Sequence, residues 1–97
     1  MAQNLTNLRQ YRTEILALCQ KYHASNIRVF GSVARNESIE TSDVDFLVDM
    51  PKRQSILQRV HLKLDLEELL GCSVDVARAD NLPELIAEQI LKEACPL

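Results

Sequence analysis

The spacing of apolar positions predicts helices at both ends and in the middle of the chain. Apolar residues recur at helical spacing over residues 5–22 and over residues 56–70. Ser55 and Gln58 form a capping-box pattern ahead of the second helix, and Gly71 is a suitable residue for its left-handed C-cap. The first segment is therefore expected to be an amphipathic helix. The second has apolar residues on more than one face, which fits either a partner surface or a well-covered core helix.

A third helix is predicted near the C-terminus, over residues 82–94. Asn81 and Glu84 are placed to cap its start, and Pro96 is placed to end it.

Three short apolar runs predict strands at residues 26–31, 43–50 and 72–77. Between the first two, residues 32–36 fit one helical turn and residues 37–42 a polar loop. The order is α-β-β-α-β-α, with a helical turn after the first strand. We expect a small α/β (α+β) domain, in which helices pack on a mixed sheet of at least three strands.

Length and charge limit the possible functions. The chain has 97 residues, which suits one domain spanning residues 1–97 and leaves no room for a second one to hold a substrate. The net charge is −3, and the densest basic cluster is the pair Lys52 and Arg53. Bulk binding of DNA or RNA is therefore disfavoured, whereas recognition of a small RNA end stays open.

The cysteines indicate a reducing compartment. Cys19, Cys72 and Cys95 are odd in number, far apart, and set among apolar neighbours, so buried or half-buried reduced thiols are expected. No apolar run reaches the roughly 18 residues of a membrane span. A soluble, cytoplasmic protein is expected.

Two like charges lie at the start of a strand that otherwise has core character. Asp43 and Asp45 share one face, because side chains alternate along a strand, while Val44, Phe46 and Val48 share the other. Taken alone, such a pair is most often a turn residue followed by a solvated charge.

A third carboxylate changes this interpretation. Asp75 lies in the middle of the apolar run SVDVA. If that strand lies beside the strand of Asp43 and Asp45, all three carboxylates meet on one surface, where they repel one another. A divalent cation relieves the repulsion, and carboxylate oxygens suit Mg²⁺.

A possible phosphate-binding turn precedes the aspartates. Gly31 permits close approach of the backbone to a ligand, and Ser32 can cap the following helical turn or donate its hydroxyl to a phosphate oxygen. Arg35 lies one turn further on and can add a phosphate contact. Each feature alone is common, so the prediction depends on their combination with the three carboxylates.

The succession GSVAR, SDVDFLV and VDV resembles the nucleotidyltransferase superfamily that includes DNA polymerase β. The resemblance covers roughly residues 27–77. It implies that Gly31 and Ser32 hold a triphosphate, and that Asp43, Asp45 and Asp75 bind two Mg²⁺ ions. It also implies catalysis by these ions, with Asp75 accepting the proton of the attacking hydroxyl.

The short length resembles the minimal nucleotidyltransferase group of this superfamily. Arg35 matches an arginine common after Gly-Ser-x-Ala in that group, whereas Asn36 stands where glycine is usual. Asparagine tolerates positive φ better than most residues, so the turn is expected to survive.

The resemblance also implies a partner and a reaction. Proteins of this group pair with a HEPN-domain RNase toxin and act as its antitoxin, so transfer of AMP from ATP to a tyrosine of such a partner is the leading hypothesis. Two alternatives remain: a non-catalytic antitoxin that neutralises its partner by binding alone, and nucleotidyl transfer to an RNA end or a small molecule.

Overall fold

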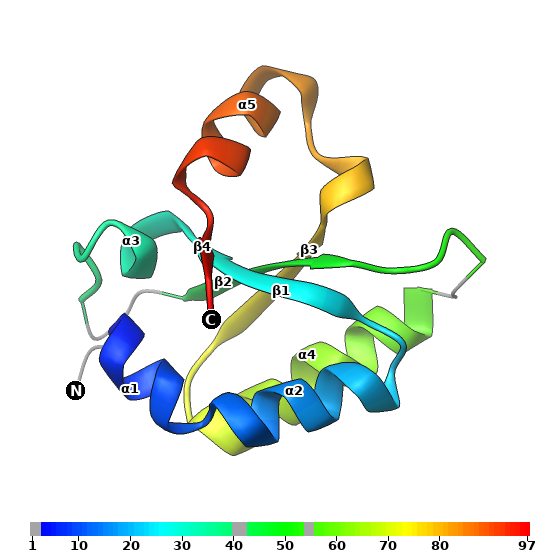
Figure 1. Ribbon diagram of the computed structural model, residues 1–97, viewed down its shortest axis with the longest axis horizontal. Helices are drawn as coiled ribbons and strands as arrows, with labels where there is room; N and C mark the ends of the chain where they lie inside the picture. Colours follow the sequence, from blue (N-terminus) through cyan, green and yellow to red (C-terminus); the bar gives the residue numbers. More distant parts are fainter. Residues whose placement is uncertain (1–2, 40–42, 54–55) are drawn as a thin grey trace.

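A mixed β-sheet forms the centre of the molecule (Figure 1). The computed structural model describes residues 3–39, 43–53 and 56–97, and within them four strands pair in the order β3-β2-β1-β4. These are β1 (Ser25–Phe30), β2 (Val44–Asp49), β3 (Val74–Arg78) and β4 (Cys95–Pro96). β1 runs antiparallel to β2 and β4, and β2 runs parallel to β3, so the expected mixed sheet is confirmed.

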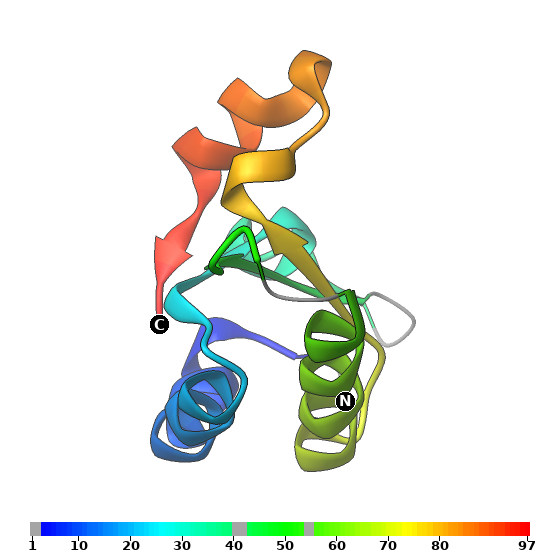
Figure 2. The ribbon, with the colours of Figure 1, turned by 90° about the vertical axis from the view of Figure 1, so that its right-hand side faces the viewer.

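Helices lie on both sides of this sheet (Figures 1 and 2). On one side are α1 (Leu5–Gln10), α2 (Arg12–Lys21) and α4 (Ile56–Leu70), and on the other is α5 (Glu84–Glu93). The remaining short helix, α3 (Gly31–Ala34), follows β1 directly. α4 is the crossover between the parallel strands β2 and β3, as that pairing requires.

The main core lies between the sheet and the three helices α1, α2 and α4. Val44, Phe46 and Val48 of β2 are each 0% exposed there, as the alternation of β2 predicts. The opposite face of β2 is more covered than its sequence suggests, since Leu47, two residues after Asp45, is also 0% exposed. The acidic side chains of this face therefore lie at the two ends of the strand, with Asp45 near its start, the exposed Asp49 at its end and the covered Leu47 between them.

The predicted helix over residues 5–22 is two helices that meet at Tyr11. The Tyr11 N–H donates to the Leu8 oxygen at 3.0 Å, which tightens the last turn of α1, and α2 then begins at Arg12. The prediction of one continuous helix is wrong at this residue. At the start of α1, the Asn4 side chain accepts from the Asn7 N–H at 2.8 Å and acts as a cap.

The predicted cap at Gly71 is confirmed, whereas the predicted cap at Asn81 is wrong. Gly71 has φ +68° and closes α4 as expected, with its N–H donating to the backbone carbonyl oxygen of Glu67 at 2.8 Å. Asn81 does not cap α5, because it belongs to a separate turn of 3₁₀-helix, η1 (Ala79–Asn81). Pro83 is the N-cap residue instead, without a side-chain hydrogen bond. The predicted cap at Ser55 falls outside the described residues.

Residues after α5 form a strand that the sequence analysis does not predict. Cys95 and Pro96 pair with Val29 and Arg28 at the free edge of β1. Two residues are too few to produce an alternating pattern, so the pairing depends on the edge that β1 offers.

The three cysteines have the burial that their apolar neighbours predict. Cys19 is buried, Cys72 and Cys95 are half-buried, and all three are free thiols. Burial raises the pKa of the Cys19 thiol to about 11, so this thiol stays protonated. Within residues 3–39, 43–53 and 56–97 no helix has both the length and the apolar character needed to cross a bilayer.

Candidate active site

Asp45 and Asp75 are neighbours across two parallel strands. The register of β2 and β3 places them directly opposite each other, at the strand spacing of roughly 4.8 Å. Asp43 immediately precedes β2 and lies one pleat before Asp45. Asp45 is half-buried, whereas Asp43 and Asp75 are exposed. The fold thus brings together the three carboxylates that the sequence separates by up to 32 positions.

This cluster changes the acidity of its most buried member. Burial, followed by the negative charges of Asp75 and Asp43, raises the pKa of Asp45 to about 6. The positive charge of Arg35 acts in the opposite direction. A carboxylate held under such repulsion is stabilised by any cation that reaches it.

The carboxylates do not form a closed metal cage by themselves. Among the described residues, no three His, Cys, Asp or Glu side chains are arranged to hold a metal ion. Mg²⁺ is usually bound by one or two carboxylates together with waters and substrate phosphates, so such a cage is not what this ion requires. The donor atoms present, all carboxylate oxygens, fit Mg²⁺.

Gly31 lies against the carboxylate of Asp45. Its φ of +75° belongs to the left-handed region, and a Cβ built on it would lie 2.3 Å from Asp45 Oδ2. Any other residue would displace that oxygen. The glycine of the predicted turn is therefore required both by the backbone and by the carboxylate beside it.

Arg35 and Glu93 form an ion pair next to this glycine. Arg35 Nη1 lies 3.2 Å from Glu93 Oε1 and 3.0 Å from Oε2, and the Gly31 N–H donates to Oε1 at 2.9 Å. Arg35 Nε also contacts Glu37 at 3.3 Å. Glu93 is not among the site residues that the sequence predicts. Its charge on a surface helix gives no local signal, and only the fold brings it 62 positions back to Gly31.

The turn around α3 matches the prediction at Asn36 and differs from it at Ser32. Asn36 has φ +58°, so it takes the conformation for which glycine is usual. The Glu37 N–H donates to the backbone carbonyl oxygen of Ser32 at 2.8 Å and closes the turn. Ser32 itself is half-buried, and Phe30 rather than Ser32 is the N-cap residue of α3.

The edge of the sheet beyond Asp75 is lined by cations. A small cavity between β3 and α4 is bounded by Arg59, Val60, Lys63, Asp75 and Val76. The neighbouring surface of α4 carries a row of exposed apolar side chains, here called the α4 stripe: Ile56, Leu57, Val60 and Leu64, which are 37–72% exposed. An acidic site and an apolar helix face are thus adjacent.

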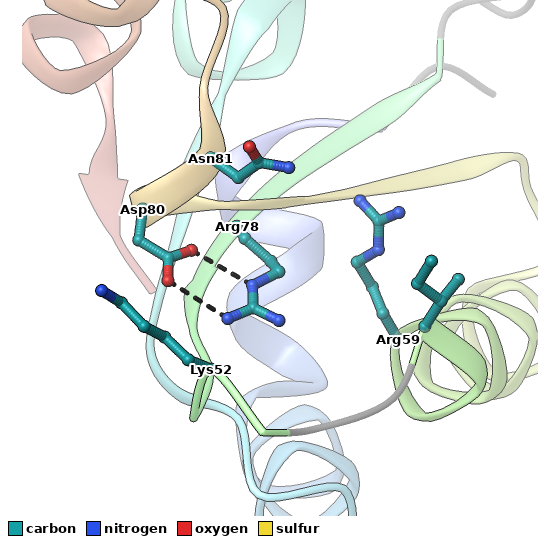
Figure 3. Close-up of a pocket in the computed structure, with 6 residues that line it drawn as sticks. Lys52, Arg59, Arg78, Asp80 and Asn81 are labelled. Atoms are coloured by element: carbon teal, nitrogen blue, oxygen red, sulfur yellow. Dashed lines mark hydrogen bonds and ion pairs between the residues drawn. The ribbon is translucent and has the colours of Figure 1, made fainter.

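A second cavity, of about 330 Å³, lies at the far ends of β2 and β3. Figure 3 shows the Arg78 guanidinium directed at Asp80, with Lys52 and Arg59 on either side. Arg78 makes two contacts of 3.1 Å with Asp80 and also donates to the carbonyl oxygens of Met50 and Pro51. Arg78 therefore ties the end of β2 to η1, and Lys52 and Arg59 extend the basic edge that begins beside Asp75.

Comparison with known proteins identifies relatives over most of the chain. Residues 13–97 match the family model described as polymerase beta, nucleotidyltransferase. A predicted protein adenylyltransferase of Methanocaldococcus jannaschii is 40% identical over 88 residues, which cover 91% of this chain and 95% of that protein. The protein adenylyltransferase MntA of Thermococcus cleftensis is 41% identical over 76 residues, covering 78% of this chain and 77% of its own.

Solved structures show the same fold. A predicted minimal nucleotidyltransferase superimposes with a TM-score of 0.85 at 44% identity, covering 98% of this chain and 97% of the other. An MNT antitoxin complex with a tri-AMPylated HEPN toxin of Shewanella oneidensis matches with a TM-score of 0.69, covering 91% and 69%. That likeness is at 18% identity and establishes the fold alone.

Proposed function

Because the chain belongs to the polymerase β family of nucleotidyltransferases, we propose that it transfers AMP from ATP to a tyrosine hydroxyl of a HEPN-domain toxin and so acts as an antitoxin. The observation that carries the proposal is the register of Asp45 and Asp75, with Gly31 placed over Asp45. This arrangement combines a carboxylate cluster with a backbone N–H and an arginine, the groups that phosphoryl chemistry uses.

The three aspartates are proposed to hold Mg²⁺. Asp43 and Asp45 would bind one ion and, with Asp75, a second. The half-buried Asp45, which like charges surround, supports this assignment, because a cation offsets the repulsion. When bound, the ions neutralise phosphate charge and make the acceptor hydroxyl more acidic.

The remaining groups of the site are assigned to binding and proton transfer. The Gly31 N–H, the Ser32 hydroxyl and the Arg35 guanidinium would hold the phosphates. The acceptor oxygen attacks the α-phosphorus, the bond from that phosphorus to the bridging oxygen breaks, and pyrophosphate leaves. Asp75, exposed at the open edge of the cluster, would accept the hydroxyl proton.

A protein acceptor is supported by the surface beside Asp75. An acceptor hydroxyl that reaches Asp75 must approach over the edge formed by β3 and α4. That edge carries the α4 stripe next to Arg59 and Lys63, which suits a folded partner with an apolar patch and acidic residues. Relatives named protein adenylyltransferase, and a fold neighbour solved with an AMPylated HEPN toxin, support the same class of acceptor.

A prokaryotic cytoplasm is the proposed location. The three free thiols fit a reducing compartment, and the curated relatives described above come from archaea.

Intact mass of the partner provides the decisive test. A HEPN-domain protein proposed as the partner would be incubated with this chain, ATP and Mg²⁺, and gain of mass in whole AMP units is expected. Asp45→Asn should abolish the gain, whereas Asp49→Asn should retain it, because Asp49 pairs with Arg28 at 3.0 Å outside the carboxylate cluster.

The same experiment separates the two alternatives. A binding-only antitoxin would still neutralise its partner when both Asp43 and Asp45 are replaced by Asn, and the partner's mass would never change. With labelled ATP, transfer to RNA would put the label on tRNA, tested side by side with the partner, and the partner protein would stay unlabelled. Absence of label on the partner, on tRNA and on small hydroxyl compounds would refute the transferase proposal.

A further inference from the structure

The Glu93 carboxylate accepts hydrogen bonds from two of the donors that the proposed function assigns to phosphate. It accepts from the Gly31 N–H at 2.9 Å and from Arg35 Nη1 at 3.2 and 3.0 Å. Backbone N–H groups and arginine guanidinium groups are donors that bind phosphate oxygens. A carboxylate offers two acceptor oxygens to the same donors, so it can take the place of two phosphate oxygens.

The position of Glu93 is unusual for an acidic residue. It adds a further negative charge near Asp45, where it is the smallest of the causes that raise the pKa of that carboxyl. Its side chain is only 17% exposed, so it has also lost most of its water. Arg35 and the Gly31 N–H offset these costs as long as no other anion competes for them.

We propose that Glu93 is an internal competitor of the nucleotide: its carboxylate closes the phosphate site of the free protein and must leave Gly31 and Arg35 before the phosphates bind. The inference rests on the proposed function, and it adds a residue that sets how tightly nucleotide is held. Inorganic phosphate makes few contacts outside Gly31 and Arg35, so it cannot displace Glu93. A nucleotide that is also held at the cluster of Asp43, Asp45 and Asp75 can displace it.

Only the Glu93 side chain has to move. Ile90 anchors α5 through its buried side chain, and the pairing of β4 with β1 holds the chain just after Glu93. The Arg35 side chain is 41% exposed, so the ion pair lies at the boundary with solvent and the carboxylate can turn outward without unfolding the helix. Opening is therefore compatible with the rest of the fold.

The first test measures affinity for a non-hydrolysable ATP analogue with Mg²⁺ by titration calorimetry. Glu93→Gln keeps an oxygen for the Gly31 N–H but removes the charge that binds Arg35. If the closed form makes up about 90% of the free protein, this variant should bind about tenfold more tightly than wild type. The matched control is Glu88→Gln on the same helix, where the exposed Glu88 pairs with Lys92, and it should bind like wild type.

A second test observes the competition directly in the wild-type protein. The chain has two glycines, Gly31 and Gly71, so glycine-selective ¹⁵N labelling gives one amide signal at the site and one internal reference. The analogue should shift the Gly31 signal and leave that of Gly71, at the end of α4, unchanged. In the free Glu93→Gln variant the Gly31 signal should already be displaced from its wild-type position.

The outcomes separate this inference from the proposed function. If the analogue binds to wild type, and Glu93→Gln binds equally or more weakly, Glu93 is a structural tie and the inference is wrong while the function stands. A Gly31 signal that does not move at saturation would overturn it equally. If neither wild type nor Glu93→Gln binds the analogue, both the inference and the proposed function are wrong.

Discussion

A Cβ atom at position 31 would lie 2.3 Å from Oδ2 of Asp45. No real Cβ contact is this short, so the glycine of one segment and the aspartate of another depend on each other. Gly31 also holds φ +75°, and its N–H faces Glu93. A substitution at Gly31 would therefore affect three features of the site: the backbone turn, the position of the Asp45 carboxylate and the contact with Glu93.

Gly31→Ala should impair transfer far more than it impairs folding. The clashing atom is the end of the Asp45 side chain, which can turn away. We expect a loss of about 2 kcal/mol in the free energy of unfolding and about a 100-fold fall in transfer rate. Gly71→Ala is the control, since it has φ +68° with nothing within 4 Å of the added Cβ, and should cost about 1 kcal/mol without loss of activity. Urea unfolding measures the stability of the two variants, and a transfer assay measures their activity. Equal activity of the two variants would contradict the role given to Gly31.

Asp45→Asn should stabilise the metal-free protein at neutral pH. The pKa of Asp45 is raised from 3.8 to about 6, so the folded state binds more protons than the unfolded state between these values. Stability is therefore lost as pH rises through that window. After allowance for solvent screening of a half-buried group, the variant should gain about 1 kcal/mol at pH 7.5 and little at pH 4. Urea unfolding in EDTA at the two pH values measures this. A variant destabilised equally at both would show that Asp45 is not under repulsion.

Asp75→Asn should lose transfer without losing the fold or nucleotide binding. Asp75 is exposed and is proposed to accept the hydroxyl proton, and a general base contributes about 10²–10⁴-fold to a rate. The expected result is a fall of at least about 100-fold in single-turnover rate, with the affinity for an ATP analogue changed by less than about threefold. Glu68→Gln, an exposed acid on α4, is the control. Retention of full activity by Asp75→Asn would remove it from the mechanism.

The α4 stripe is expected to contact the partner. Leu57→Asp or Leu64→Asp places a charge on a side chain that is 63% or 52% exposed, and each should weaken the complex with a HEPN partner about tenfold or more. Binding of an ATP analogue should not change. Leu85→Asp on α5 provides the control, because Leu85 is 99% exposed on the other side of the sheet. If Leu85→Asp weakens the complex and the α4 variants do not, the partner binds the opposite side.

Much of this site could be predicted because it is encoded in local patterns. Alternation along β2 determines that Val44 and Phe46 are buried while Asp45 faces the other way. The preference of asparagine for positive φ predicts the turn at Asn36, where φ is +58°. These features depend on a residue and its immediate neighbours, so a single sequence is enough to predict them.

Other features could not be predicted, because they depend on parts of the chain far apart in sequence. β4 consists of two residues that pair only because the edge of β1 is free. The break at Tyr11 interrupts a segment whose helical spacing continues on both sides.

Side-chain periodicity and backbone preference act over a few residues, so the sequence alone is enough to predict β1, β2 and β3, the positive-φ positions Asn36 and Gly71, and the set of carboxylates. The positions of Asp45 beside Asp75, and of Glu93 against Gly31 and Arg35, are known only from the folded structure. The reason is physical: strand register and helix docking are set by packing of the whole core. A charge such as that of Glu93 acquires its role only when this packing places donors within 3 Å of it.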